Sequence, residues 1–320
     1  MKQGNQRLSI AQLNAWRQQK FGLFLHFGTS TYDGIEMSPG TISPAEINPT
    51  QLDVKQWVQA GKIAGARYII LTVKHVGGFC LWPTAYTPYH VMHTPIARDI
   101  VGEFCAECRK ENIAPCLYYC SWDNHNLFGS KTPSMTKWED AFVTQAYFDF
   151  QKNQIMELLD RYAPIAELWI DIPHVLGRNY RTLLYDAIAQ KSPETVIVYN
   201  HGLSMCDGSV FNVAKAWPTD IITIEKNLPQ STGGYAPWRE IEEKEYYMPG
   251  EVVETLTDGW FYLPNEKTRT LAELLGMYLV AQARGCNFVL NIAPNQEGII
   301  AKEQFALLAQ LQTEIQRFEK

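Results

Sequence analysis

The feature that most constrains the fold of this chain is a repeated alternation of short apolar runs with longer amphipathic segments. Short apolar runs are typical of strands buried on both faces, and amphipathic segments are typical of surface helices. The alternation therefore predicts a parallel sheet whose strands are connected by helices. The candidate strands are Gly22–Phe27, Tyr68–Val73, Ala114–Tyr119, Glu167–Ile172, Val196–Asn200, Ile221–Ile224, Val252–Leu256 and Asn287–Ile292.

Eight strands is the number found in the (β/α)8 barrel of the α/β class. The candidate helices between and after the strands are Asp53–Ala64, Ile100–Glu111, Asp140–Tyr162, Tyr180–Lys191, Leu271–Arg284 and Ala301–Phe318. An irregular segment, Asn227–Gly250, joins the sixth and seventh strands instead of a helix. Because α/β barrels of about 250 residues or more form one unit, we expect residues 1–320 to form a single TIM-like catalytic domain.

Polar side chains stand at or just after the C-terminal end of every candidate strand. They are His26, Lys74, His75, Tyr119, Ser121, Trp122, Asp171, Asn200, His201, Glu225, Glu254, Thr255 and Asn291. In a parallel barrel these ends share the face that carries the active site. Strands often end in polar residues simply because the loops that follow are exposed to solvent, and this explains residues such as Asn200. It explains less well the two isolated carboxylates Asp171 and Glu225, which follow apolar runs.

Two carboxylates facing each other across a pocket favour glycoside hydrolysis, in which one acts as nucleophile and the other as general acid and base. Flat aromatic faces, against which a sugar ring can lie, are offered by Trp82, Trp122, Trp169, Trp260 and Phe261. A place in the core is the competing interpretation for each of these aromatic residues, since Trp is highly buried on average.

Other catalytic chemistries lack their sequence motifs. The chain has no His-x-His, no His-Glu-x-x-His, no Gly-x-Ser-x-Gly and no glycine-rich phosphate-binding motif, so we expect neither a metal nor a cofactor. Cys105, Cys108, Cys116 and Cys120 could be read as a zinc site, but the first pair falls on a helical stripe and the second on a strand. The seven cysteines, an odd number mostly within apolar runs, favour a reducing compartment.

Charge and hydropathy limit the partners. The formal net charge is −6 without a basic patch, so nucleic acid is not an expected partner. No apolar run approaches the roughly 18 residues that span a bilayer, and residues 1–19 lack the apolar centre of a signal peptide. We therefore expect no membrane association and a cytoplasmic location for the chain as given.

Several segments together resemble the α-L-fucosidases of glycoside hydrolase family 29. They are Phe21–Gly28, Trp57 with Ala64–His75, Gly78–Pro83, Leu117–Tyr119 with Ser121, Glu167–Asp171, Gly259–Tyr262 and Asn287–Ile292. They follow the order and spacing of that family from about Phe21 to Pro294, and the long run from Ala64 to Pro83 makes a chance match improbable.

The resemblance implies a barrel enzyme that removes terminal α-L-fucose from fucosylated oligosaccharides or glycosides with retention of configuration. The family's nucleophile is the Asp after a Leu-Trp-x run, which here is Asp171. The acid/base is carried over to Glu225, with Glu251 and Glu254 as alternatives. A barrel that binds fucose or a related deoxy sugar without efficient turnover is the competing hypothesis, although the two carboxylates favour the enzyme.

The resemblance also indicates sugar-binding residues. The candidates, together with the aromatic residues above, are His26, His75, Trp82, Tyr119, Trp169, His201 and Trp260. The chain departs from the family where Val76-Gly77 replaces a second His and an Asp, and His201 stands where some members have Arg. Phe27 stands where Trp is common, and only one helix follows the eighth strand, so we expect no C-terminal β-sandwich.

Overall fold

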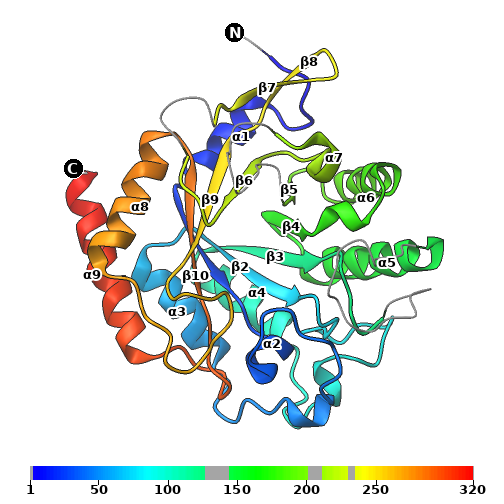
Figure 1. Cartoon of the computed structure of the whole chain (residues 1–320), viewed down its shortest axis with the longest axis vertical. Coiled ribbons are helices and arrows are strands. Elements are labelled where there is room, and N and C mark those ends of the chain that lie inside the picture. Colours follow the sequence, from blue (N-terminus) through cyan, green and yellow to red (C-terminus); the bar gives the residue numbers. More distant parts are fainter. Residues whose placement is uncertain (1–2, 127–143, 201–210, 230–234, 320) are drawn as a thin grey trace.

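A sheet of eight strands, each parallel to its neighbours, forms the centre of the molecule (Figure 1). The computed structural model describes residues 3–126, 144–200, 211–229 and 235–319. The strands are β1 (Phe21–Leu25), β2 (Tyr68–Lys74), β3 (Ala114–Cys120), β4 (Glu167–Asp171), β5 (Val196–Tyr199), β6 (Ile222–Glu225), β9 (Gly250–Thr255) and β10 (Asn287–Ile292). Their order is β5-β4-β3-β2-β1-β10-β9-β6, and the predicted (β/α)8-like barrel is confirmed.

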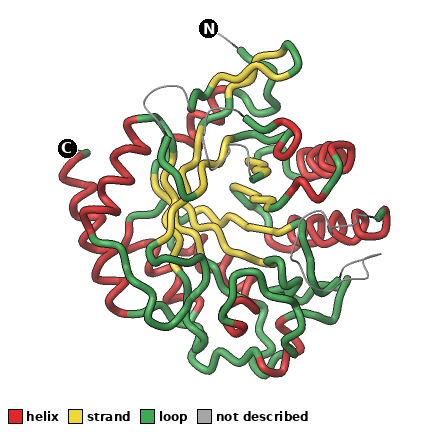
Figure 2. The backbone as a smooth tube through the Cα atoms, in the orientation of Figure 1, coloured by secondary structure: helices red, strands yellow, loops and turns green. Residues whose placement is uncertain are grey.

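Helices surround this sheet (Figures 1 and 2). They are α2 (Thr29–Asp33), α3 (Val54–Ala64), α4 (Ile100–Lys110), α5 (Gln145–Tyr162), α6 (Arg178–Lys191), α7 (Val213–Ala216), α8 (Leu271–Ala283) and α9 (Lys302–Phe318). Short 3-10 turns lie at Pro44–Glu46, Val91–His93 and Pro173–Val175. Asp53 and Asp99 cap α3 and α4 by accepting hydrogen bonds from backbone N–H groups of the first turn, which fixes where each helix begins.

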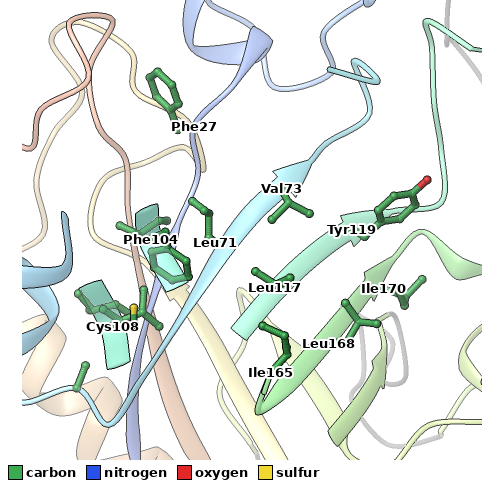
Figure 3. Close-up of a cluster of buried hydrophobic side chains, with 14 of the residues drawn as sticks. Phe27, Leu71, Val73, Phe104, Cys108, Leu117, Tyr119, Ile165, Leu168 and Ile170 are labelled. Atoms are coloured by element: carbon green, nitrogen blue, oxygen red, sulfur yellow. The ribbon is translucent and has the colours of Figure 1, made fainter. Parts of the chain in front are cut away.

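The two faces of the strands carry different side chains, because successive residues of a strand point to opposite sides. Leu71 of β2, Leu117 of β3 and Leu168 of β4 belong to an outer cluster that packs against the helices. Figure 3 shows Leu71 beside Phe104 of α4, and Leu168 beside Ile165 and Ile170. The alternate residues belong to a second, inner cluster.

Helix α1 (Ile10–Arg17) covers the N-terminal ends of the strands. A reciprocal pair of hydrogen bonds between Ser9 and Gln12 starts this helix, and Leu13 and Trp16 are buried in the inner cluster. The Trp16 indole donates to Glu167, the first residue of β4, and the Trp16 carbonyl accepts a bond from the Asn287 amide. The polar segment 1–19 therefore contributes a helix that the sequence analysis does not predict.

The ring of strands is completed by side chains where β5 meets β6. In this β5–β6 seam, defined as residues 196–200 and 219–225, Asp220 donates its backbone N–H to the carbonyl of Ile197 at 2.9 Å. The Asp220 carboxylate accepts the backbone N–H of Ile197 at 2.8 Å, and the Thr219 hydroxyl accepts that of Tyr199 at 3.1 Å. Side-chain oxygens thus take the place of strand carbonyls.

One other feature differs from the sequence expectations. The segment Asn227–Gly250 contains an antiparallel hairpin of β7 (Trp238–Ile241) and β8 (Lys244–Tyr247). Its turn places Glu242 and Glu243 at φ of 51° and 63°, a conformation in which Asn and Gly are the usual residues, so the hairpin has no ordinary turn signal. Among the described residues, no helix combines the length and the apolar character that crossing a bilayer requires.

The seam generates a stability prediction. Asp220 also accepts hydrogen bonds from Arg7 and, at 2.5 Å, from Tyr185, and its side chain is 1% exposed. Asp220→Asn replaces one acceptor oxygen by an NH2 group facing these donors, so we expect a loss of about 2–4 kcal/mol in the free energy of unfolding, measured by urea titration. Asp160→Asn, at a side chain that is 58% exposed, is the control and should cost less than about 0.5 kcal/mol.

Candidate active site

A pocket of about 290 Å³ lies at the C-terminal ends of the strands, the end where α/β barrels carry their active sites. Most of its lining residues face inward from the ends of strands or follow those ends, and several are polar. They are Phe24, His26, Glu36, His75, Tyr118, Trp169, Asp171, Asn200, Glu225 and Trp260. Asp171 and Glu225 thus share one pocket.

Asp171 is the last residue of β4, and both of its carboxylate oxygens accept hydrogen bonds. The Tyr118 hydroxyl donates to Oδ2 at 2.6 Å, and the Asn200 side-chain amide donates to Oδ1 at 2.7 Å. Bonds of this kind favour the ionised form of a carboxyl group and fix its orientation. The two hydrogen bonds therefore fix the orientation of the Asp171 carboxyl group within the pocket.

The same amide nitrogen of Asn200 donates to Oε2 of Glu225 at 2.8 Å. These carboxylate oxygens of Asp171 and Glu225 therefore lie no further apart than the sum of their distances to that nitrogen, about 5.5 Å. The Thr223 hydroxyl donates to the carbonyl oxygen of the same amide at 2.8 Å, so the amide can present only its NH2 group to the two carboxylates.

His26 follows β1 and is fixed by a chain of hydrogen bonds. Its Nδ1 lies 2.6 Å from the side-chain oxygen of Asn291, whose amide nitrogen donates to the carbonyl of Trp260. Burial, together with the neighbouring His75, lowers the pKa of His26 to about 3. The ring is thus neutral, with its proton on Nδ1, and Nε2 remains an acceptor for a ligand hydroxyl.

His75 follows β2 and is packed among aromatic rings. It stacks on Tyr118 with 5.7 Å between ring centroids and meets the edge of Phe261 at 4.8 Å. Burial lowers its pKa to about 4, although the Asp171 charge acts in the opposite direction. Nδ1 of His75 has no hydrogen-bond partner within the part of the chain that the structure describes.

Trp169 and Phe24 form an apolar floor, with their rings at 5.5 Å and nearly perpendicular. Trp169 also stacks on Tyr118 at 5.8 Å, and its indole N–H donates to Glu251 at 3.1 Å. At the side of the pocket, the Trp260 ring lies 5.3 Å from that of His26. Flat apolar faces beside polar side chains give the pocket a surface against which a ring-shaped ligand can lie.

Three polar residues of the pocket have no assigned role in the sequence analysis. In the sequence, Asn200 is only one of many polar residues at strand ends. Tyr118 is adjacent to Tyr119, and the sequence does not show which of the two side chains faces the interior of the barrel. Glu36 lies in the loop after α2 and does not directly follow a strand in the sequence, so no sequence pattern indicates that it lines the pocket. Partial burial raises the pKa of the Glu36 carboxyl, while the positive charge of Lys226 acts to lower it.

Two predicted sugar-binding residues lie elsewhere. Tyr119 points outward from β3 into the outer cluster (Figure 3), where its hydroxyl donates to Gln154 at 2.8 Å. The prediction is wrong by one residue, because adjacent strand residues face opposite sides and Tyr118 takes the inward place. Trp82 is also in the outer cluster, and its indole donates to Glu157 of α5 at 2.8 Å.

The alternatives for the acid/base do not line the pocket. Glu251 is buried inside the barrel, where it accepts hydrogen bonds from Tyr68 and Trp169. Glu254 lies three residues further along β9 and pairs with Arg269 at 3.4 Å. His201 lies outside the described residues.

The departure at Val76-Gly77 is accommodated by close packing. Val76 is fully buried in the inner cluster. A Cβ at position 77 would lie 2.3 Å from the Thr29 hydroxyl oxygen and 2.8 Å from that of Ser38, so this loop has no room for a side chain there. Among the described residues, no three His, Cys, Asp or Glu side chains are arranged to hold a metal ion.

Comparisons with known proteins all indicate the same family. The family model described as alpha-L-fucosidase matches residues 42–317. The chain is 29% identical to alpha-L-fucosidase 1 of Arabidopsis thaliana over 94% of its own length and 59% of that protein. It is 31% identical to putative alpha-L-fucosidase 1 of Oryza sativa subsp. japonica over 97% of its own length and 58% of that protein. The chain thus spans less than two thirds of these relatives.

Among solved structures, the fold is similar to that of a glycoside hydrolase family 29 α-L-fucosidase from Bacteroides thetaiotaomicron, trapped as a covalent intermediate with 2-fluoro-fucosyl fluoride. The TM-score is 0.78 at 21% identity, covering 100% of this chain and 77% of that one. This likeness concerns the fold, whereas the family model matches most of the sequence. The chain therefore belongs to the alpha-L-fucosidase family, glycoside hydrolase family 29.

Proposed function

We propose that the chain is a retaining exo-α-L-fucosidase, which hydrolyses terminal α-L-fucosyl linkages of glycans or glycosides by double displacement. The observation that carries this proposal is the single Asn200 amide that donates to both Asp171 and Glu225. It holds these two carboxylate oxygens no more than about 5.5 Å apart, which supports a retaining mechanism, since retaining glycosidases work with carboxyl groups about 5–5.5 Å apart.

In the first step, Asp171 attacks the anomeric carbon of the fucosyl residue while Glu225 donates a proton to the leaving oxygen. The glycosidic bond breaks, an ester forms between the sugar and Asp171, and the aglycone leaves as an alcohol. In the second step, Glu225 takes a proton from water, which attacks the same carbon and releases Asp171. Two inversions at the anomeric carbon give net retention.

The neighbouring groups fit these roles. Two hydrogen bonds orient Asp171 and favour its ionised form, as a nucleophile requires. Neutral His26 and His75 can exchange hydrogen bonds with sugar hydroxyls without adding a positive charge that would oppose the developing oxocarbenium ion. The aromatic faces of Trp169 and Trp260 supply apolar contact with the ring.

The comparisons support the substrate class. Both plant relatives carry the name alpha-L-fucosidase, and the bacterial enzyme was trapped as a covalent intermediate, which is the species expected on a retaining path.

Asp171→Asn is expected to lower kcat on an aryl α-L-fucoside by about 10³-fold or more, because an amide cannot form the glycosyl ester. Asp171→Gly in the presence of azide should regain activity and release β-fucosyl azide, since the anion attacks from the vacated side. Fucose binding by calorimetry on the Asn variant checks that the pocket is intact. If Asp171→Asn keeps a kcat within about tenfold of the parent, the nucleophile is another residue. If the parent binds fucose but hydrolyses no fucoside, the result supports the non-catalytic alternative.

The stereochemical outcome is the second test. If two inversions occur, early ¹H NMR spectra of the hydrolysis should contain α-L-fucose before mutarotation produces the β anomer. A β anomer formed first would require direct attack of water and would exclude the double displacement.

Glu225→Gln tests the acid/base. Loss of proton donation should slow a fucosyl disaccharide, whose leaving group is poor, by at least about 100-fold more than an activated dinitrophenyl fucoside. Glu254→Gln on the same barrel end is the matched control and should affect both substrates equally. The assignment fails if Glu254→Gln, rather than Glu225→Gln, discriminates between the leaving groups.

A further inference from the structure

A second pair of carboxyl groups lies inside the barrel, outside the active-site pocket. Glu167 begins β4 and Glu251 is the second residue of β9, and both side chains are completely buried. Neither residue lines the pocket. Two carboxyl groups in such a place are costly, since burial strongly disfavours an isolated charge. Their contacts should therefore explain why the chain tolerates them.

Glu251 is an acceptor at both oxygens. The Tyr68 hydroxyl donates to Oε1 at 2.9 Å, and the Trp169 indole donates to Oε2 at 3.1 Å. Glu167 has a different environment: its Oε2 accepts from the Trp16 indole at 2.8 Å, while its Oε1 has no donor among the described residues. The two carboxyl groups lie within hydrogen-bonding reach of each other.

A hydrogen bond between two carboxyl groups requires a proton on one of them. The groups facing the pair are the Tyr68 hydroxyl from β2, the Cys116 thiol from β3, the Trp169 indole from β4 and the Trp16 indole from α1. No Lys, Arg or His contacts either carboxyl within the described part of the chain. Burial raises the pKa of both glutamates, that of Glu167 further because of the Glu251 charge.

We propose that Glu167 keeps its proton at neutral pH and donates it to Glu251, and that the Glu251 carboxylate holds the Trp169 indole in place as the floor of the active-site pocket. Glu251 then receives three hydrogen bonds and carries the one negative charge of this pair. Both glutamates are positioning residues, because they act on the pocket through Trp169. This proposal rests on the proposed function only in the experiments that measure fucosidase activity.

The path from this pair to the reacting groups is short. Trp169 donates to Glu251 on one side and stacks on Tyr118 at 5.8 Å on the other. The Tyr118 hydroxyl in turn donates to Asp171 at 2.6 Å. A displaced indole would therefore disturb both the sugar-binding floor and the orientation of the proposed nucleophile.

The proton can be observed directly in the parent protein. At pH 8, the infrared difference spectrum of parent minus Glu167→Gln should contain the C=O band of a protonated carboxyl group. The spectrum of parent minus Glu254→Gln, a variant on the outer face of the same barrel, should lack that band. Absence of the band from the first spectrum would overturn the proposal, and this measurement does not depend on fucosidase activity.

The two glutamine variants should differ. In Glu167→Gln the amide NH2 can still donate to the Glu251 carboxylate, so KM for an aryl α-L-fucoside should stay within about twofold of the parent. Glu251→Gln has one acceptor oxygen for three donors, so KM should rise about tenfold and the tryptophan emission should shift. Equal effects of the two variants, or an unchanged KM in Glu251→Gln, would contradict the positioning role.

The pH dependence of the free energy of unfolding provides a further test, which needs no substrate. Burial raises the pKa of Glu251 to about 7, so Glu251 also takes up a proton below that pH and the proton on Glu167 is tested above it. There the native parent retains a proton that an unfolded glutamate has lost, so unfolding of the parent should become more favourable, by up to tenfold in its equilibrium constant per pH unit, as the pH rises from about 7.5 to 9. Glu167→Gln should lack this one-proton dependence in urea titrations. Parallel curves for the two proteins would overturn the proposal, whereas a parent inactive on fucosides with the expected curves would overturn the proposed function alone.

Discussion

The constraint on which the structure depends is that every second residue of eight parallel strands projects into an interior closed to water. A polar group in that space must find its partner in another part of the chain, because no solvent can supply one. At the lower end, Glu167 and Glu251 share hydrogen bonds with Trp16, Tyr68 and Trp169. At the upper end, where the barrel opens, the same rule produces the polar network of the pocket.

Asn200 illustrates how this rule shapes the candidate site. Its side chain has one acceptor and two donor positions, and Thr223 occupies the acceptor with a bond of 2.8 Å. The NH2 group is then left to bridge Asp171 and Glu225. An aspartate at position 200 would put a third carboxylate beside the first two, so the amide is the side chain that suits both the geometry and the charge.

Much of this arrangement can be predicted from the sequence. The apolar runs identify all eight barrel strands, and the carboxylates at the ends of two of them, Asp171 and Glu225, do meet in one pocket. The choice between adjacent tyrosines cannot be made from composition, since Tyr118 and Tyr119 are identical in chemistry and differ only in the face they occupy.

Other contacts depend on tertiary structure that has no local signal. Helix α1 lies in a mostly polar segment, and only the N-terminal end of the barrel gives Leu13 and Trp16 a place to be buried. The hairpin of β7 and β8 turns through two glutamates at positive φ, which the neighbouring strands must stabilise. Glu36 reaches the pocket from a loop, and loop paths are set by contacts distant in sequence.

The seam between β5 and β6 connects the fold to the proposed chemistry. Asn200 follows β5 and Glu225 ends β6, so the amide and the proposed acid/base come from the two strands that no regular ladder joins. At one end of the seam Asp220 binds the backbone of β5, and at the other the Asn200 amide binds Glu225. Because strands in a regular ladder are fixed by repeated backbone bonds and these two are not, the separation of the two carboxylates depends on a few side-chain contacts. Substitutions in the seam should therefore alter the distance between the carboxyl groups before they unfold the barrel.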